Sequence, residues 1–127
     1  MIDRYTRPQM ASIWSEESKY RNWLRVELAA TDALAAAGIV PAEAAVDLRA
    51  KADFTVARIH EIERDTRHDV LAFTTAVAES TGESARWLLY GLTSTDIVDT
   101  AQALAITQAS ILIREGIVLN SFPQFGF

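Results

Sequence analysis

The chain has 127 residues, half of them apolar, 9% aromatic and 23% charged, with a formal net charge of −5. This composition excludes a disordered chain, which would be poorer in apolar residues and richer in charge. The acidic balance argues against general nucleic-acid binding, which needs a basic surface. The absence of cysteine excludes disulfides and thiolate metal sites, and two histidines are too few for a usual zinc site. We expect a folded protein without metal or nucleic acid.

Residues 1–5 contain no apolar run typical of a signal peptide. No stretch of about 18 uninterrupted apolar residues is present, which argues against a transmembrane helix. We therefore expect a cytoplasmic protein that does not bind a membrane.

Glycine and proline are scarce and separate segments with helical spacing, so the pattern predicts an all-α fold. Pro8 can open a short helix, and Ser15 is expected to cap a second helix of about six turns that ends near Gly38. One face of this second helix carries apolar side chains and a threonine at helical spacing: Tyr20, Trp23, Leu24, Leu28, Thr31 and Leu34.

Pro41 restarts a helix, and Asp53 is expected to cap the next one. A further helix is predicted from Val70 to Ala78, ending near Gly82. No segment alternates in the manner of a strand.

The last helix is predicted to begin near residues 93–96, a cluster of hydroxyl and carboxylate cap formers. Apolar residues cover nearly every face of this helix as far as Ile113, so it must be buried on most sides. Either the chain oligomerises through this helix, or the helices that should surround it are missing. From Gly116 to Phe127 the apolar residues have no clear period, and we expect a divergent tail.

Thr66-Arg67-His68-Asp69-Val70 is the first candidate site. Arginine can clamp a phosphate or carboxylate, and histidine can transfer a proton near neutral pH. The aspartate can orient the histidine or accept ligand hydroxyls. The alternative is a solvated turn in which Asp69 caps the following helix.

Gly91-Leu92-Thr93-Ser94-Thr95-Asp96 is the second candidate site. Free N–H groups at a helix start bind anions, and the hydroxyls of Thr93 and Ser94 add donors. The alternative is an ordinary helix cap. Near the N-terminus, Arg4 and Tyr5 could meet a phosphate, although a mobile terminus is the other interpretation.

Together these motifs resemble the adenylosuccinate lyases over roughly residues 1–115. The most specific matches are Thr66–Val70 and the stretch from Tyr90 to Thr100; residues 1–5, 14–17, 19–20 and 51–54 match as well. The resemblance favours the functional interpretation of both candidate sites.

The resemblance implies an all-α, homotetrameric carbon–nitrogen lyase of the fumarase and aspartase superfamily, with no cofactor. Residues 1–92 would form the N-terminal helical domain, 93–115 would start the first long helix of the central bundle, and 116–127 would be the divergent tail. The implied reaction removes fumarate from adenylosuccinate and from succinyl-aminoimidazole-carboxamide ribotide, in purine and AMP biosynthesis.

The resemblance also implies roles for individual residues on an anionic nucleotide. Arg4 and Tyr5 would hold the phosphate. Arg67, His68 and Asp69 would line the nucleotide site, with His68 as a catalytic acid. Thr93 and Ser94 would bind the succinyl carboxylates. We expect these groups to converge on one polyanionic ligand.

Two departures from the family pattern stand out. Leu89 occupies a position where the family often has a histidine, and leucine can neither titrate nor form a side-chain hydrogen bond. The family's second catalytic histidine, its serine loop and its lysine and asparagine signature would follow residue 127. We therefore expect a truncated fragment that is inactive by itself.

Two other functions remain open. The chain could be a non-enzymatic helical oligomerisation module whose last helix inserts into another bundle. It could also be a related lyase, such as an argininosuccinate lyase or a carboxymuconate cycloisomerase. The paired Arg4-Tyr5 and the Thr66–Val70 motif speak against this related-lyase interpretation.

Overall fold

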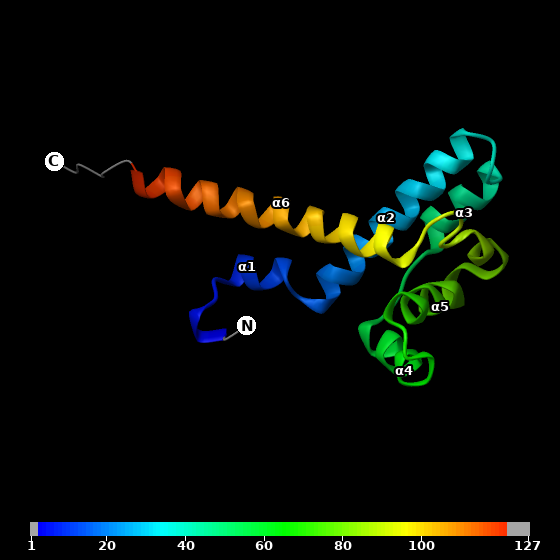
Figure 1. Cartoon of the computed structure of the whole chain (residues 1–127), viewed down its shortest axis with the longest axis horizontal. Helices are drawn as coiled ribbons and strands as arrows, with labels where there is room; N and C mark the ends of the chain where they lie inside the picture. The colour runs from blue at the N-terminus through cyan, green and yellow to red at the C-terminus, as the bar shows by residue number, and fades with distance from the viewer. Residues whose placement is uncertain (1–2, 122–127) are drawn as a thin grey trace.

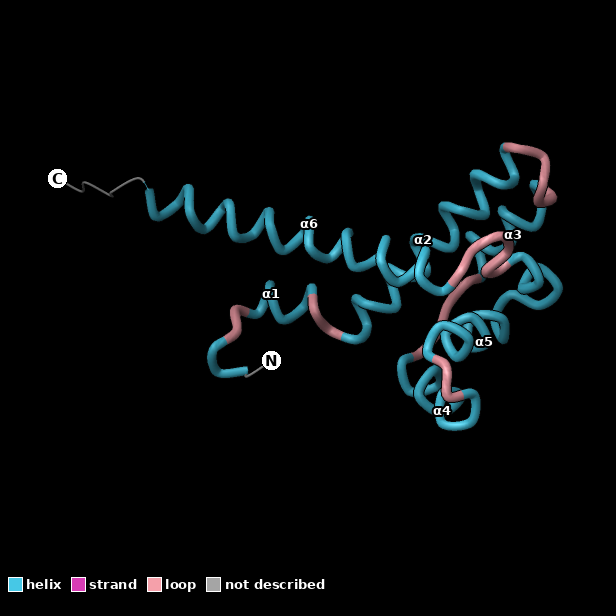
Figure 2. Tube along the Cα trace, in the orientation of Figure 1, coloured by secondary structure: helices cyan, strands magenta, loops and turns pink. Residues whose placement is uncertain are grey.

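The computed structural model describes residues 3–121, and every regular element within that range is helical, which confirms the all-α prediction (Figures 1 and 2). The elements in chain order are η1 (Asp3–Tyr5), α1 (Pro8–Ile13), α2 (Glu16–Ala36), α3 (Ala42–Lys51), α4 (Val56–Thr66), α5 (Asp69–Thr81), η2 (Gly82–Trp87) and α6 (Ser94–Ser121).

The helices form a body and a rod (Figure 1). The body consists of α2 to α5 with η2, where α4 packs on α5 and α3 packs on α2 and η2. The rod is α6, which packs on α2 near its start and then runs away from the body beside α1. The two candidate sites lie at junctions of the body, between α4 and α5 and before α6.

The ends of α2 follow from local sequence chemistry. Ser15 caps the helix, because its Oγ accepts a hydrogen bond of 3.2 Å from the N–H of Ser18. At the other end Gly38 has a φ of +73°, a conformation that glycine adopts without steric cost. The Ile39 N–H then reaches back to the carbonyl of Leu34, at 2.9 Å. The predictions for Ser15 and Gly38 are therefore confirmed.

The predicted cap of α4 was wrong by two residues. Thr55 is the cap, and its hydroxyl accepts from the N–H of Arg58 at 3.3 Å. Asp53 instead accepts a hydrogen bond of 2.9 Å from the Arg21 guanidinium on α2. The Phe54 N–H, and then Arg21, lower the pKa of the Asp53 carboxyl. Asp53 therefore forms a long-range ion pair with Arg21 instead of capping α4, as local spacing predicted.

An aromatic cluster forms the centre of the body. Phe73 on α5 is fully buried, and its ring stacks against that of Tyr20 with centroids 6.0 Å apart. Trp23 and Phe54 meet the same ring edge-on, at 5.5 and 5.8 Å. Burial raises the pKa of Tyr20 to about 12, so its phenol is neutral. The cluster joins α2, the segment before α4, and α5.

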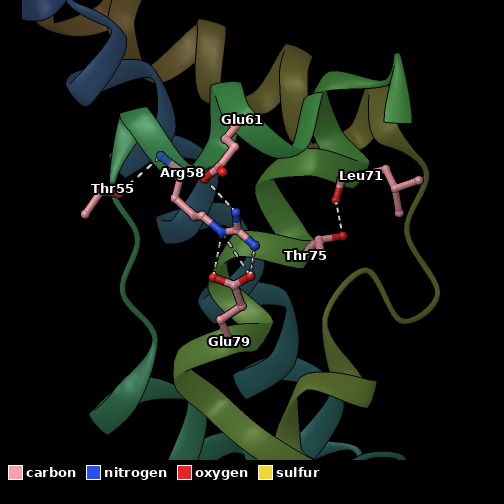
Figure 3. Close-up of polar contacts among 6 residues, drawn as sticks. All are labelled: Thr55, Arg58, Glu61, Leu71, Thr75 and Glu79. Atoms are coloured by element: carbon pink, nitrogen blue, oxygen red, sulfur yellow. Dashed lines mark hydrogen bonds and ion pairs between the residues drawn. The ribbon is translucent and has the colours of Figure 1, made fainter. Parts of the chain in front are cut away.

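Arg58 ties α4 to α5 on the surface of the body (Figure 3). Its guanidinium donates to both carboxylate oxygens of Glu79, at 2.7–3.1 Å, and also to Glu61. Such two-pronged pairing holds the side chains in one geometry. The turn between α4 and α5 therefore joins two helices whose relative position is held by the core and by this ion pair.

Most of the α6 rod is not covered by the described part of the chain. Its exposed large aliphatic side chains are Ile106, Ile111, Ile113, Ile117, Val118 and Leu119. By length and composition alone, Ser94–Leu119 could also cross a membrane. The apolar pattern becomes irregular at Gly116, but the helix does not end there. α6 continues as far as Ser121. The rest of the predicted tail, 122–127, lies outside the described residues.

Candidate functional site

The turn between α4 and α5 is made by Arg67 and His68. Arg67 ends α4 in the left-handed conformation, with φ of +51°, and its N–H bonds to the carbonyl of Glu63 at 2.9 Å. Its Nε donates to the carbonyl of Arg64 at 3.1 Å, which turns the guanidinium back along α4. The terminal nitrogens of Arg67 therefore stay at the surface.

His68 is the N-cap of α5, whereas the solvated-turn alternative placed Asp69 in that role. The Nδ1 atom of His68 accepts a hydrogen bond of 3.1 Å from the N–H of Leu71. Because Nδ1 accepts, the ring proton resides on Nε2, which is left to act as a donor. Asp69 starts the helix, and its Oδ1 accepts from the N–H of Val70 at 2.8 Å.

Arg67 borders an open hollow of about 510 Å³. Its other lining residues are His60, Glu63 and Arg64, so the hollow belongs to α4 and its end. Two arginines against one glutamate give it a cationic balance suited to an anion. Neither Thr93 nor Ser94 lines it, so convergence of the two candidate sites stays a prediction for an assembled protein.

The start of α6 contains a reciprocal capping box. The N–H and the hydroxyl of Thr93 both donate to Oδ2 of Asp96, at 2.8 and 3.0 Å, and the Asp96 N–H points back to the threonine hydroxyl at 3.4 Å. These bonds from Thr93 lower the pKa of the Asp96 carboxyl. In the free chain, Asp96 therefore already occupies the donors of Thr93.

Ser94 is placed differently from Thr93. It is the first residue of α6 and half-buried, and its N–H and that of Thr95 have no acceptor within the helix. A carboxylate approaching this helix start would thus meet the first-turn N–H groups and the Ser94 hydroxyl. The ordinary cap is therefore formed by Thr93 and Asp96, and the N–H groups that could meet an anion belong to the neighbouring residues.

Arg4 and Tyr5 lie far from the other candidate residues. They belong to η1, which Figure 1 shows at the opposite side of the molecule from α4 and α5. The Arg4 guanidinium lies 4.8 Å from the centre of the exposed Tyr5 ring. Tyr5 lines a second hollow, of about 790 Å³, with residues of α1 and the end of α6. One chain therefore does not bring this pair to Arg67 or Ser94.

A buried glutamate binds the turn just before the second candidate site, and it was not among the predicted site residues. Glu27 on α2 is 1% exposed, and its Oε2 accepts a hydrogen bond of 2.9 Å from the N–H of Leu89. Its Oε1 is buried and has no hydrogen-bond partner. Burial raises the pKa of the Glu27 carboxyl, against a smaller lowering by the Leu89 N–H. A glutamate on the apolar face of α2, four residues after Trp23, was the signal that could have identified it.

The arrangement offers cationic and N–H donors for anions and one imidazole for proton transfer. Across residues 3–121, no group of three His, Asp or Glu side chains is placed to hold a metal ion. The donors described above suit an anionic ligand, and an imidazole is a side chain that can transfer a proton.

The sequence matches a known protein family and several of its members. A family model described as lyase matches residues 3–119. Adenylosuccinate lyases from Streptococcus mutans, Bacillus subtilis and Staphylococcus saprophyticus are 56%, 51% and 48% identical to the chain over 91% of its length. The chain spans 27% of the length of each of these relatives.

The fold has a solved counterpart as well. A fumarate lyase from Mesorhizobium sp. BNC1 superposes with a TM-score of 0.76 and 27% identity, over 82% of this chain and 25% of that one. The match to the family model spans residues 3–119, a range that contains both candidate sites. The resemblance to the adenylosuccinate lyases is thereby confirmed, and the chain belongs to the lyase family.

Proposed function

We propose that this chain is the N-terminal part of an adenylosuccinate lyase, acting in purine and AMP biosynthesis. The observation that carries the proposal is the 48–56% identity to three adenylosuccinate lyases over 91% of the chain. In this proposal residues 1–92 form the N-terminal domain, 93–115 begin a central bundle and 116–127 diverge. The enzyme would release fumarate from adenylosuccinate and from the succinyl-carboxamide ribotide.

The proposed substrates carry one phosphate and two carboxylates, which match the donors on the chain. Arg4 and Tyr5 would hold the phosphate, since a guanidinium group can donate two parallel hydrogen bonds to phosphate oxygens. Thr93 and Ser94 would bind the succinyl carboxylates at the start of α6. For Thr93, a ligand carboxylate would have to take the place of Asp96.

Arg67, His68 and Asp69 would line the nucleotide site. As general acid His68 would be the imidazolium: Nδ1 would take up a proton and release the Leu71 N–H, and the acid proton would be the one on Nε2. That nitrogen would protonate the departing amine while Arg67 neutralises charge on the ligand.

We also propose a homo-oligomer, with the family tetramer as the assembled form, in the cytoplasm. Arg4 and Tyr5 lie away from Arg67 within one chain, so a complete site would combine these groups from different copies. The exposed aliphatic side chains of α6 supply an apolar surface for such packing. We propose other helices rather than lipid as its covering, because the lyase match continues to residue 119.

Binding of AMP to the purified chain tests the proposal. Replacing Arg67 by Ala should weaken AMP binding by roughly tenfold or more, since a charge-assisted hydrogen bond is lost. Arg49→Ala is the matched control, because this exposed arginine on α3 removes the same charge outside the proposed site. Isothermal titration that shows equal AMP affinity in both variants would refute the assigned pocket.

A second function is favoured by the uncovered α6 surface: a helical oligomerisation module without enzymatic activity. Light scattering and the AMP titration together distinguish the lyase from the oligomerisation module. Stable self-association combined with no affinity for AMP or succinate would favour the module over the lyase.

A further inference from the structure

The carboxyl of Glu27 is isolated within the body. It projects from α2 with 1% exposure, one oxygen accepts the N–H of Leu89, and the other has no partner. Buried carboxyl groups are rare, and an unpaired buried polar atom is costly. An apolar side chain at position 27 would fill the same space without burying an unpaired oxygen. Packing alone therefore does not explain why a carboxyl group is found at this position.

The residue that Glu27 holds is in an unusual conformation. Leu89 has a φ of +57°, in the left-handed region that leucine rarely adopts. Such backbone persists only where the surroundings determine it. The hydrogen bond to Glu27 Oε2 is the contact that fixes the Leu89 N–H in that orientation.

From Leu89 the constraint passes to the start of α6. The carbonyl of Leu89 accepts the N–H of Leu92 at 3.3 Å, and Gly91 within this turn has a φ of +73°. Thr93 follows directly and opens the capping box with Asp96. A short series of bonds therefore leads from α2 through Leu89 and Leu92 to the donors of α6.

Resting on the proposed function, we propose that Glu27 is a positioning residue, whose carboxylate holds the 88–92 turn in the conformation that presents Thr93 and Ser94 to a ligand carboxylate. Glu27 does not touch the ligand in this scheme. It acts through the Leu89 N–H, and its unpaired oxygen is the cost of placing an acceptor there.

A positioning role and a purely structural role predict different results for Glu27→Leu. A positioning role predicts a local change in the 88–92 turn, whereas a purely structural role predicts a change throughout the body. Leucine fills much of the same volume and removes the unpaired buried oxygen, so the body should keep most of its stability and the cost of the lost hydrogen bond should fall on the 88–92 turn. The Leu89 N–H would lose its acceptor, and the turn would open more often. Glu27→Gln keeps an acceptor oxygen and should rescue the turn.

The experiment measures two quantities in the full chain: amide hydrogen exchange along 88–94 and succinate affinity. In Glu27→Leu we expect exchange at Leu89 to rise about tenfold or more while exchange at Phe73 stays unchanged, and succinate affinity to fall about tenfold. Glu27→Gln should stay within about threefold of the parent in both quantities. Thr31→Val is the matched control, because Thr31 is a buried polar residue on α2 whose hydroxyl bonds the Glu27 carbonyl rather than the turn.

The outcomes separate this inference from the proposed function. If the parent chain binds no succinate, the assigned carboxylate site fails, while Leu89 exchange still decides whether Glu27 holds the turn. Leu89 exchange within about threefold of the parent in Glu27→Leu would overturn the inference. Faster exchange with unchanged succinate affinity would overturn it too, because the turn would then be held without consequence for binding.

Discussion

Replacing Phe73 by leucine should destabilise the body more than any equally conservative change on its surface. The Phe73 ring is fully buried and meets three other rings, those of Tyr20, Trp23 and Phe54. Leucine keeps an apolar group in the site but removes the three ring contacts that Phe73 makes. The change therefore tests whether this cluster is the centre of the fold.

The magnitude follows from those contacts. Truncating a buried phenylalanine to alanine costs about 3–5 kcal/mol, and leucine recovers much of that volume. Each aromatic pair adds about 0.5–1.5 kcal/mol beyond burial, but the three pairs share one ring and are not additive. We expect a loss of about 2 kcal/mol, or a fall in Tm of roughly 8 °C for a domain of this size.

Urea unfolding followed by circular dichroism measures the loss at a fixed protein concentration. Leu71→Ala is the control, because Leu71 lies on the same helix and is 47% exposed, so its loss should be well under that of Phe73→Leu. If the two variants have equal midpoints at equal slope, the cluster is not what holds α5 to α2.

Three further outcomes follow from contacts described above. His68→Ala should cost about 1 kcal/mol, because the Leu71 N–H loses its acceptor, whereas His68→Asn should cost little; equal Tm losses would exclude the cap. Arg58 lowers the pKa of Glu79 below its ordinary 4.5, so the pair's contribution is present above pH 4.5 and is lost as the pH falls through the lowered folded value. Urea midpoints of Glu79→Gln should therefore decline less on acidification, and a parallel decline would contradict the pairing. Ile113→Asp should reduce self-association in a light-scattering dilution series, and no reduction would show that this face of α6 is not the interface.

The helix ends that depend on neighbouring residues could be predicted from the sequence. Ser15 and Gly38 act through bonds to residues at most five positions away, so spacing contains the necessary information. Asp53 did not follow this rule, because its partner Arg21 lies 32 residues earlier and on another helix. Tertiary competition for a side chain is not visible in a local pattern.

The candidate site was predictable to the same degree. The motifs containing Arg67, His68 and Thr93 lie at helix junctions, as their composition indicated. Their hydrogen-bond partners were not predictable: His68 caps α5 through Nδ1, and Asp96 takes the donors of Thr93. Glu27 was missed because a charged residue within an apolar stripe is usually assigned to the solvent side.

The division into body and rod implies an order of events during biogenesis. The core draws Tyr20, Trp23, Phe54 and Phe73 from α2 to α5, whereas α6 adds only its first turns, through Ile97 and Ala101. Collapse of the body therefore needs no second molecule, whereas the far turns of α6 would be covered only in the proposed oligomer. Maturation should accordingly show a fast step independent of protein concentration and a slower bimolecular step. Between the folding step and the association step, the exposed aliphatic side chains of α6 would be the surface that a holdase chaperone binds.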